Sequence, residues 1–202
     1  MIKKEPMIFT HGNRTVPKIA VTFDGGSTDF QTERILRILQ KTEAKSIFFL
    51  TGEFIDHYPE LTKRMVQDGH EIGNHSNPHP DFTKLSTDEM IKEIALCEEK
   101  IFRTTGITPR PLFRQPYGYY NQKVLNAVHQ AGYRSILWSL DSRDWKQRKT
   151  NYLVHKIVGK AENGDIVLFH LNSKNTPEAL EIILPLLKNK FQLVTIKVLL
   201  GL

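Results

Sequence analysis

Short apolar segments of strand length alternate along this chain with longer segments that have the apolar spacing of helices. Residues 19–23 alternate large and small side chains, and residues 46–50 form a continuous apolar run. Between them, the apolar residues at 35, 36, 38 and 39 have the spacing of an amphipathic helix. This order predicts an α/β fold with a parallel sheet, because parallel strands need long crossover connections, which are usually helices.

Seven strands are predicted in this way, separated by helices. They cover residues 19–23, 46–50, 70–74, 111–113, 134–140, 165–170 and 191–195. In a chain of 202 residues this order predicts either an open doubly wound sheet or a closed, shortened barrel. No linker or low-complexity segment interrupts the sequence, so we expect residues 1–202 to form a single domain. No G-x-G-x-x-G or P-loop pattern follows a strand, which removes most support for a nucleotide site.

Two helix starts carry local signals. Ser86 and Glu89 have the spacing of a capping box, in which the two side chains accept hydrogen bonds from each other's backbone N–H groups. The apolar stripe that follows makes Cys97, the only cysteine, a buried core residue rather than a nucleophile. Further along the chain, Thr176 followed by Pro177 predicts a helix that has Thr176 as its N-cap.

The charge balance and the apolar runs limit the classes of function. The 28 Lys and Arg residues exceed the 22 Asp and Glu residues, so the formal net charge is +6, which favours anionic surroundings. The lysines are dispersed and no nucleic-acid-binding motif is present, so we expect no nucleic-acid partner. No apolar run reaches the length of about 18 residues that a membrane span needs. Residues 1–6 hold two lysines without the apolar stretch of a signal peptide.

Ionisable or metal-binding side chains, with one tryptophan beside them, stand at five of the predicted strand ends. In parallel α/β folds, ligands bind beyond the carboxyl ends of the strands, so these side chains share one face. Singly, each has an ordinary explanation as a turn residue or a surface group, but together they predict an active site. The residues are Asp24, His75, His79, Arg114, Tyr117, Asp141, Asp144, Trp145 and His170.

These residue types suit the hydrolysis of an amide. Two neutral imidazoles can hold a divalent metal, which polarises a carbonyl and activates water. A carboxylate can act as the general base and a histidine as the general acid toward the leaving nitrogen. An arginine beside the base keeps it ionised, and an aspartate beside the histidine raises its basicity.

The chain resembles the polysaccharide deacetylase family (carbohydrate esterase family 4, the NodB homology domain) from about residue 18 to its C-terminus. Five motifs occur in the family's order, and the second and third together are highly specific. The motifs are Thr22-Phe-Asp24, His75-Ser-Asn-Pro-His79-Pro80, Arg114-Gln-Pro-Tyr117, Asp141-Ser-Arg-Asp144-Trp145 and Leu168-Phe-His170.

The resemblance implies a distorted (β/α)7 barrel that removes N-acetyl groups from amino-sugar polymers such as peptidoglycan or chitin-like oligosaccharides. It also implies a divalent metal, zinc in the first place, with cobalt or nickel as alternatives. The implied roles are Asp24 as general base, Arg114 as its orienting partner, His170 as general acid, Asp144 as the group that tunes it, and His75 and His79 as metal ligands. The backbone N–H of Tyr117 would help to hold the oxyanion, and Trp145 would be a sugar platform or would pack beneath His170.

One residue departs from the family's pattern. The first motif of the family usually has a second aspartate, which is the third metal ligand, and here that position is Gly25. Metal binding should therefore be weak, unless water, Asp24 itself or Asp29 completes the ligand shell. On this reasoning, Gly25→Asp should restore the carboxylate and tighten metal binding.

Three alternatives to a glycan deacetylase remain at this point. The first is a carbohydrate-binding protein on the same scaffold with weak or no catalysis, which Gly25 favours. The second is an enzyme of the same family that acts on a small amide, and the third, the basic nucleic-acid binder, has the least support. The substrate class implies an exported or cell-wall-associated protein whose targeting segment lies outside this chain.

Overall fold

The strands form one curled, parallel sheet in the computed structural model, which describes residues 7–202. The sheet has the order β1-β6-β5-β4-β3-β2-β8-β7, and β9 pairs with β2. This is an α/β half-barrel, so the expectation of a distorted barrel is confirmed and the open doubly wound sheet is wrong. The strands are β1 (Ile8–Phe9), β2 (Lys18–Gly25), β3 (Ile47–Leu50), β4 (Glu71–Asn74), β5 (Leu112–Phe113), β6 (Arg134–Ile136), β7 (Leu140–Asp141), β8 (Ile166–His170) and β9 (Gln192–Leu193).

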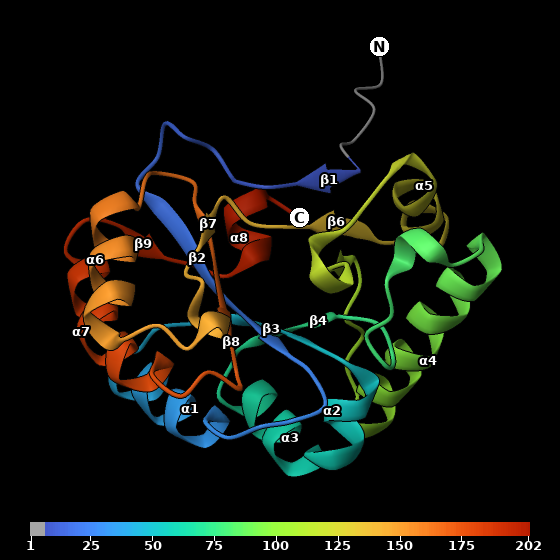
Figure 1. Cartoon of the computed structure of the whole chain (residues 1–202), viewed down its shortest axis with the longest axis horizontal. Helices are drawn as coiled ribbons and strands as arrows, with labels where there is room; N and C mark the ends of the chain where they lie inside the picture. Colours follow the sequence, from blue (N-terminus) through green and yellow to red (C-terminus); the bar gives the residue numbers. More distant parts are fainter. Residues whose placement is uncertain (1–6) are drawn as a thin grey trace.

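Helices surround the sheet on its outer side. Figure 1 shows α6 and α7 at the left, α1, α2 and α3 along the bottom, and α4 and α5 at the right, while α8 lies near the middle of the view. The helices are α1 (Thr32–Lys41), α2 (Gly52–His57), α3 (Pro59–Gln67), α4 (Thr87–Thr105), α5 (Gln122–Gln130), α6 (Thr150–Lys160), α7 (Thr176–Lys188) and α8 (Ile196–Leu200). Short 3-10 turns are η1 (Phe82–Lys84), η2 (Pro116–Gly118) and η3 (Asp144–Lys146).

The expected single strand at residues 134–140 is wrong, and its interruption explains the curl of the sheet. Residues 134–136 form β6, which pairs with β5, whereas residues 140–141 form β7, which pairs with β8 at the other end of the order. Only residues 137–139 separate the two strands, so the far ends of the sheet must curve toward each other. Leu137 N donates to Phe9 O, while Ser139 N donates to Ile166 O, so this link divides its hydrogen bonds between the two ends.

Successive side chains of β2 point alternately to the outer and the inner face of the curled sheet. Residues 19, 21 and 23 belong to the large apolar core between the sheet and the helices, whereas Ala20 belongs to a smaller core inside the barrel. Thr22 and Asp24 follow Ala20 on the inner side, because successive strand residues point to opposite faces. The inner core, which includes Ile196 and Leu199 of α8, therefore gives way to polar side chains toward the carboxyl end of β2.

Other local expectations have mixed outcomes. The capping box of Ser86 and Glu89 is present at the start of α4, and Cys97 is fully buried. No pattern in the sequence predicted α2, whose N-cap is Thr51. Residues 1–6 lie outside the described residues. Among residues 7–202, no helix combines the length and the hydropathy that crossing a bilayer needs.

Candidate active site

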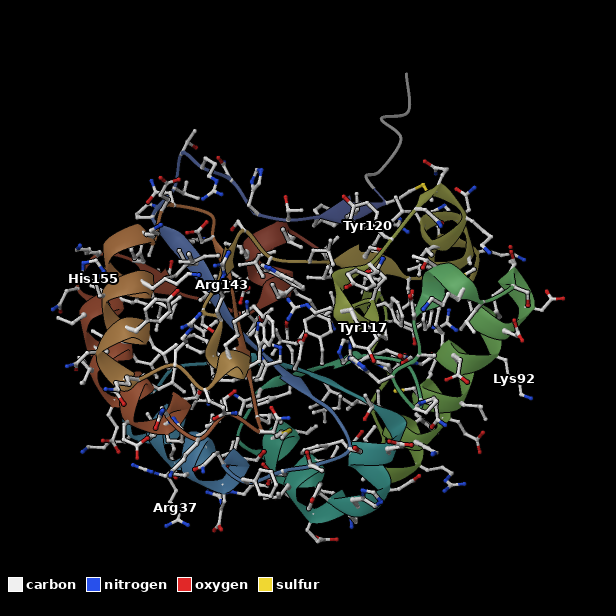
Figure 2. The ribbon with its side chains drawn as sticks, viewed as in Figure 1. Arg37, Lys92, Tyr117, Tyr120, Arg143 and His155 are labelled. Carbon is white, nitrogen blue, oxygen red and sulfur yellow. The ribbon has the colours of Figure 1, made fainter. Side chains whose placement is uncertain are left out.

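A cleft of about 760 Å³ opens at the carboxyl ends of the strands. Seven of the nine residues that the sequence singled out line it, and the other two, Arg114 and Asp144, are buried. Figure 2 shows Tyr117, which belongs to η2, near the middle of the molecule. The lining residues named by the sequence analysis are Asp24, His75, His79, Tyr117, Asp141, Trp145 and His170.

Asp24, at the inner side of the end of β2, is held by Arg114. Arg114 Nη1 donates to Asp24 Oδ1 at 2.7 Å and to Thr22 Oγ1 at 2.9 Å. Burial alone would raise the pKa of Asp24, but the charges of Arg114, His75 and His170 and the hydrogen bond from Arg114 together outweigh it and lower that pKa. Asp24 is therefore an ionised carboxylate with its second oxygen available to the cleft.

Arg114 is itself fixed inside the barrel. Its Nε donates to Ile136 O at 2.8 Å and its Nη2 to Leu137 O at 3.1 Å, while the guanidinium stacks 4.1 Å from the ring centroid of Phe49. The side chain is 0 % exposed. Because the carbonyl acceptors and Asp24 satisfy its donors, this buried charge can be retained without solvent.

His170 occupies the end of β8, directly beside Asp24 in the register of β2 and β8. Its Nδ1 is 2.8 Å from Asp144 Oδ1, and its backbone N–H donates to Asp144 Oδ2 at 2.9 Å. Burial alone would lower the pKa of His170, but the hydrogen bond and charge of Asp144, with the charges of Asp24 and Asp141, outweigh it and raise that pKa. The site thus pairs a carboxylate whose surroundings favour its ionised form with an imidazole whose surroundings favour its protonated form.

Asp144 is positioned by more donors than the sequence suggested. Besides the two groups of His170, the backbone N–H of Trp145 donates to Oδ1 at 2.9 Å and the Thr176 hydroxyl donates to Oδ2 at 2.7 Å. The expected N-cap role of Thr176 is wrong: the N-cap of α7 is Asn175, because the Thr176 hydroxyl bonds Asp144 instead. No motif predicted the hydrogen bond from Thr176 to Asp144, since the two residues are 32 positions apart in the chain.

His75 and His79 bring two ring nitrogens together. The Nε2 atoms are 3.2 Å apart, and His75 Nδ1 lies 2.7 Å from the carbonyl oxygen of Arg114. That carbonyl can only accept, so His75 Nδ1 carries the proton and Nε2 offers its lone pair. Burial lowers the pKa of both histidines, to about 4 for His79.

This donor set fits a divalent metal. Two nitrogens at tetrahedral positions around zinc, each about 2.05 Å from it, would be about 3.3 Å apart, close to the separation of the two imidazoles. Asp24 Oδ2, at 3.7 Å from His75 Nε2, is the neighbouring oxygen. The described residues contain no cluster of three or more His, Cys, Asp or Glu side chains with metal-site spacing. Imidazole suits zinc, cobalt and nickel alike.

Neither Asp29 nor an aspartate introduced at position 25 is placed to be the third metal ligand in this structure. Asp29 does not line the cleft: its Oδ1 accepts hydrogen bonds from Gln31 N, Thr32 N and Thr32 Oγ1 near the start of α1. A Cβ at Gly25 would lie 2.8 Å from Leu50 Cδ2 and 2.9 Å from Leu171 Cδ1. Position 25 therefore faces apolar side chains, and the expectation that an aspartate there simply restores a ligand does not fit this backbone.

Tyr117 and Trp145 form aromatic walls of the cleft. Tyr117 has φ +61°, is 57 % exposed and lies edge-on to His79, with ring centroids 4.5 Å apart. Trp145 is 51 % exposed and lines the cleft, which favours the expected sugar platform over a position beneath His170. Sequence reasoning missed Glu53 and Trp138, which also line the cleft.

Known proteins share this sequence and this fold. The family model described as polysaccharide deacetylase matches residues 11–136. A peptidoglycan-N-acetylglucosamine deacetylase of Bacillus cereus is 37% identical over 188 residues, covering 90% of this chain and 87% of that protein. The peptidoglycan-N-acetylmuramic acid deacetylase PdaA of Bacillus subtilis is 35% identical over 176 residues, covering 86% of this chain and 67% of that protein.

Solved structures include a protein named as a deacetylase and one named as a pseudoenzyme. The Bc1960 peptidoglycan N-acetylglucosamine deacetylase superposes with a TM-score of 0.92 at 30% identity, over 97% of this chain and 94% of that one. BA3943 of Bacillus anthracis, a pseudoenzyme of carbohydrate esterase family 4, superposes with a TM-score of 0.89 at 28% identity, over 97% of this chain and 69% of that one. On this likeness of sequence, motif order and fold, the chain belongs to the polysaccharide deacetylase family.

Proposed function

We propose that this protein is a metal-assisted hydrolase that removes N-acetyl groups from amino-sugar polymers, with peptidoglycan as the leading substrate. The observation that carries the proposal is the pairing of Asp24 with His170 on adjacent strands. Arg114 favours the ionised form of the first and Asp144 favours the protonated form of the second. General acid–base catalysis needs both states at once, and the environments push the two groups in opposite directions.

In the proposed reaction, Asp24 Oδ2 accepts a proton from the water that attacks the acetyl carbonyl carbon. The backbone N–H of Tyr117 stabilises the resulting oxyanion. His170 then donates its Nε2 proton to the sugar nitrogen as the C–N bond breaks, so that acetate and a free amine leave. His75 and His79 would hold the divalent metal, which supplies Lewis acidity to the carbonyl and to the water.

The relatives support the substrate class and the cellular location of the proposal. The relatives of Bacillus cereus and Bacillus subtilis and the solved Bc1960 structure are named as peptidoglycan deacetylases. We therefore propose an exported or wall-associated protein, and a single deacetylase domain over residues 1–202. The aromatic side chains of Tyr117 and Trp145 would stack on sugar rings in the cleft.

Acetate release from N-acetylglucosamine oligomers and from purified peptidoglycan tests the proposal. Asp24→Asn and His170→Ala should each reduce kcat by about 10²–10⁴-fold, because each removes one proton-transfer group. The double variant should lose less than the product of the two, since both groups act on one intermediate. Asp88→Asn and His129→Ala, which change exposed residues of the same types, should match the unchanged protein.

A carbohydrate-binding protein without turnover is the second candidate. Gly25 favours it, because the family's third ligand is missing, and the likeness to the BA3943 pseudoenzyme gives it a precedent. The two candidates separate in one assay: glycan binding without acetate release, at saturating Zn²⁺, Co²⁺ or Ni²⁺, would select the binding protein and overturn the enzyme.

A further inference from the structure

Three consecutive residues at the end of η2 line the cleft, and the backbone there is unusual. They are Tyr117, Gly118 and Tyr119. Tyr117 and Gly118 have φ of +61° and +69°, in the left-handed region that a residue with a Cβ rarely adopts. Such a conformation persists only where the surroundings hold it, and it is concentrated at functional sites. The conformation of Tyr117 therefore points to a role for the side chains that this turn presents.

The turn is packed directly against Trp138. A Cβ at position 118 would lie 2.6 Å from Trp138 Cη2, so only glycine lets the backbone approach the indole this closely. Gly118 N donates to Gln115 O at 3.0 Å, and Tyr119 N donates to Pro116 O at 3.3 Å, which closes the turn. The backbone on both sides of Gly118 is therefore held in place by the protein itself.

The aromatic side chains of this turn form a row that starts at His79. The ring centroids of His79 and Tyr117 are 4.5 Å apart, and those of Tyr117 and Tyr119 are 5.6 Å apart, with 32° between the two phenol planes. Both tyrosines stay open to solvent, since Tyr117 is 57 % exposed and Tyr119 is 56 % exposed. We call Tyr117 and Tyr119 the tyrosine row; it leads from a candidate metal ligand along the wall of the cleft.

An exposed row of phenol rings suits a chain of sugars. The C–H face of a pyranose ring is apolar while its hydroxyls are polar, and a tyrosine side chain likewise combines an apolar ring with a polar hydroxyl. The 5.6 Å between the two phenol centroids is comparable to the length of one residue in a β-1,4-linked glycan. Successive sugars of such a chain can therefore meet successive rings of the tyrosine row.

We propose that Tyr119 binds the sugar next to the reacting one and thereby selects glycan chains over single amino sugars. This inference rests on the proposed function, because it takes the reacting acetyl group to lie at Asp24, His75 and His170. In the sheet order, the strands that carry those three residues lie between β5, which precedes η2, and β7, which precedes η3. The glycan would therefore cross the cleft from the tyrosine row to Trp145.

Acetate release from the tetramer of N-acetylglucosamine, with a divalent metal supplied, tests the proposal. Tyr119→Ala should raise KM about 3–10-fold and leave kcat within about twofold, because the ring contacts a bound sugar but no reacting atom. Tyr119→Phe keeps the ring and should retain the KM of the unchanged protein. Tyr120→Ala is the matched control, because Tyr120 is 48 % exposed but does not line the cleft, and Figure 2 shows it above Tyr117.

The dimer of N-acetylglucosamine separates a contact with the neighbouring sugar from a contact with the reacting one. A dimer can react with its second sugar on the Trp145 side of the cleft. Tyr119→Ala should therefore lower kcat/KM less for the dimer than for the tetramer. Equal losses for the two substrates, or a loss in kcat alone, would overturn the proposal, as would an equal rise in KM in Tyr120→Ala.

Calorimetric titration with the tetramer keeps this inference separate from the proposed function. If the unchanged protein binds the tetramer but releases no acetate, the proposed function fails, while Tyr119→Ala should still bind about 3–10-fold more weakly than Tyr119→Phe. If acetate is released and neither KM nor Kd depends on Tyr119, the function stands and the role of Tyr119 is overturned. No binding of the tetramer by the unchanged protein would overturn both.

Discussion

Buried partners decide what each reactive side chain can do at the scale of single residues. Asp24 and His170 lie side by side, yet Arg114 stabilises the charged form of one and Asp144 the charged form of the other. Motifs identified these four residues. Thr176, which donates to Asp144, could not be identified in this way, because the contact depends on how α7 meets η3.

Gly25 and Gly26, which follow Asp24 in the first motif, have different surroundings. A Cβ at Gly25 crowds Leu50 and Leu171, whereas a Cβ at Gly26, which lines the cleft, meets nothing within 4 Å. We expect Gly25→Ala to lower the free energy of unfolding by about 1–3 kcal/mol and Gly25→Asp to lower it further, because the carboxylate enters apolar surroundings. Urea unfolding at pH 7 measures both.

The family motif places the metal-binding aspartate at position 25, but we expect an aspartate at position 26 to increase the affinity for metal and one at position 25 not to. Calorimetric titration of chelator-stripped protein with Zn²⁺ should show tighter binding for Gly26→Asp than for the unchanged protein, and no gain for Gly25→Asp. A Gly25→Asp protein that is fully stable and binds Zn²⁺ more tightly would show that the end of β2 rearranges, and that the family's ligand position is still usable.

The break between β6 and β7 matters most at the scale of elements. An apolar pattern over residues 134–140 is typical of one strand, but residues 137–139 leave one end of the sheet and join the other. The Ser139 hydroxyl donates to Asp165 Oδ1 at 2.6 Å and accepts from Ile166 N at 3.2 Å. It thereby fixes the point at which the chain crosses the opening of the half-barrel.

Ser139→Ala should lower the free energy of unfolding by about 1–2 kcal/mol. The substitution leaves the buried Asp165 carboxylate with one donor fewer, although Arg14 still bonds it at 2.6 Å. Ser139→Thr keeps the hydroxyl on an exposed residue and should retain most of the stability. Chemical denaturation compares the three proteins, and equal losses for Ala and Thr would mean that the hydroxyl plays no part.

For the whole molecule, His70 links global stability to pH. It is 6 % exposed, Ser46 N donates to its Nδ1 at 3.2 Å, and burial together with the charge of Lys45 lowers its pKa to about 4. Between about pH 6.5 and pH 4 the unfolded chain takes up a proton there that the folded protein does not. The free energy of unfolding should therefore fall as the pH drops through this window, by about 3 kcal/mol from this group.

His70→Asn isolates that contribution. Its amide oxygen can accept from Ser46 N but does not titrate, so the difference in unfolding free energy between pH 7 and pH 4.5 should shrink relative to the unchanged protein. Metal-free protein is used throughout, and His155→Asn, at an exposed position, serves as the control. The same pH dependence in all three proteins would rule out His70 as its source.

The order of strands and helices, and the residues at the strand ends, could be predicted from the sequence by itself. Local periodicity sets both, since one face of each strand or helix must be buried, and parallel strands deliver their carboxyl ends to one side. The tertiary structure alone decided which way position 25 faces, where residues 134–140 divide and which hydroxyl holds Asp144. Each of these depends on contacts between residues far apart in the chain, such as Gly25 with Leu171 and Ser139 with Asp165, and a local pattern carries no information about such contacts.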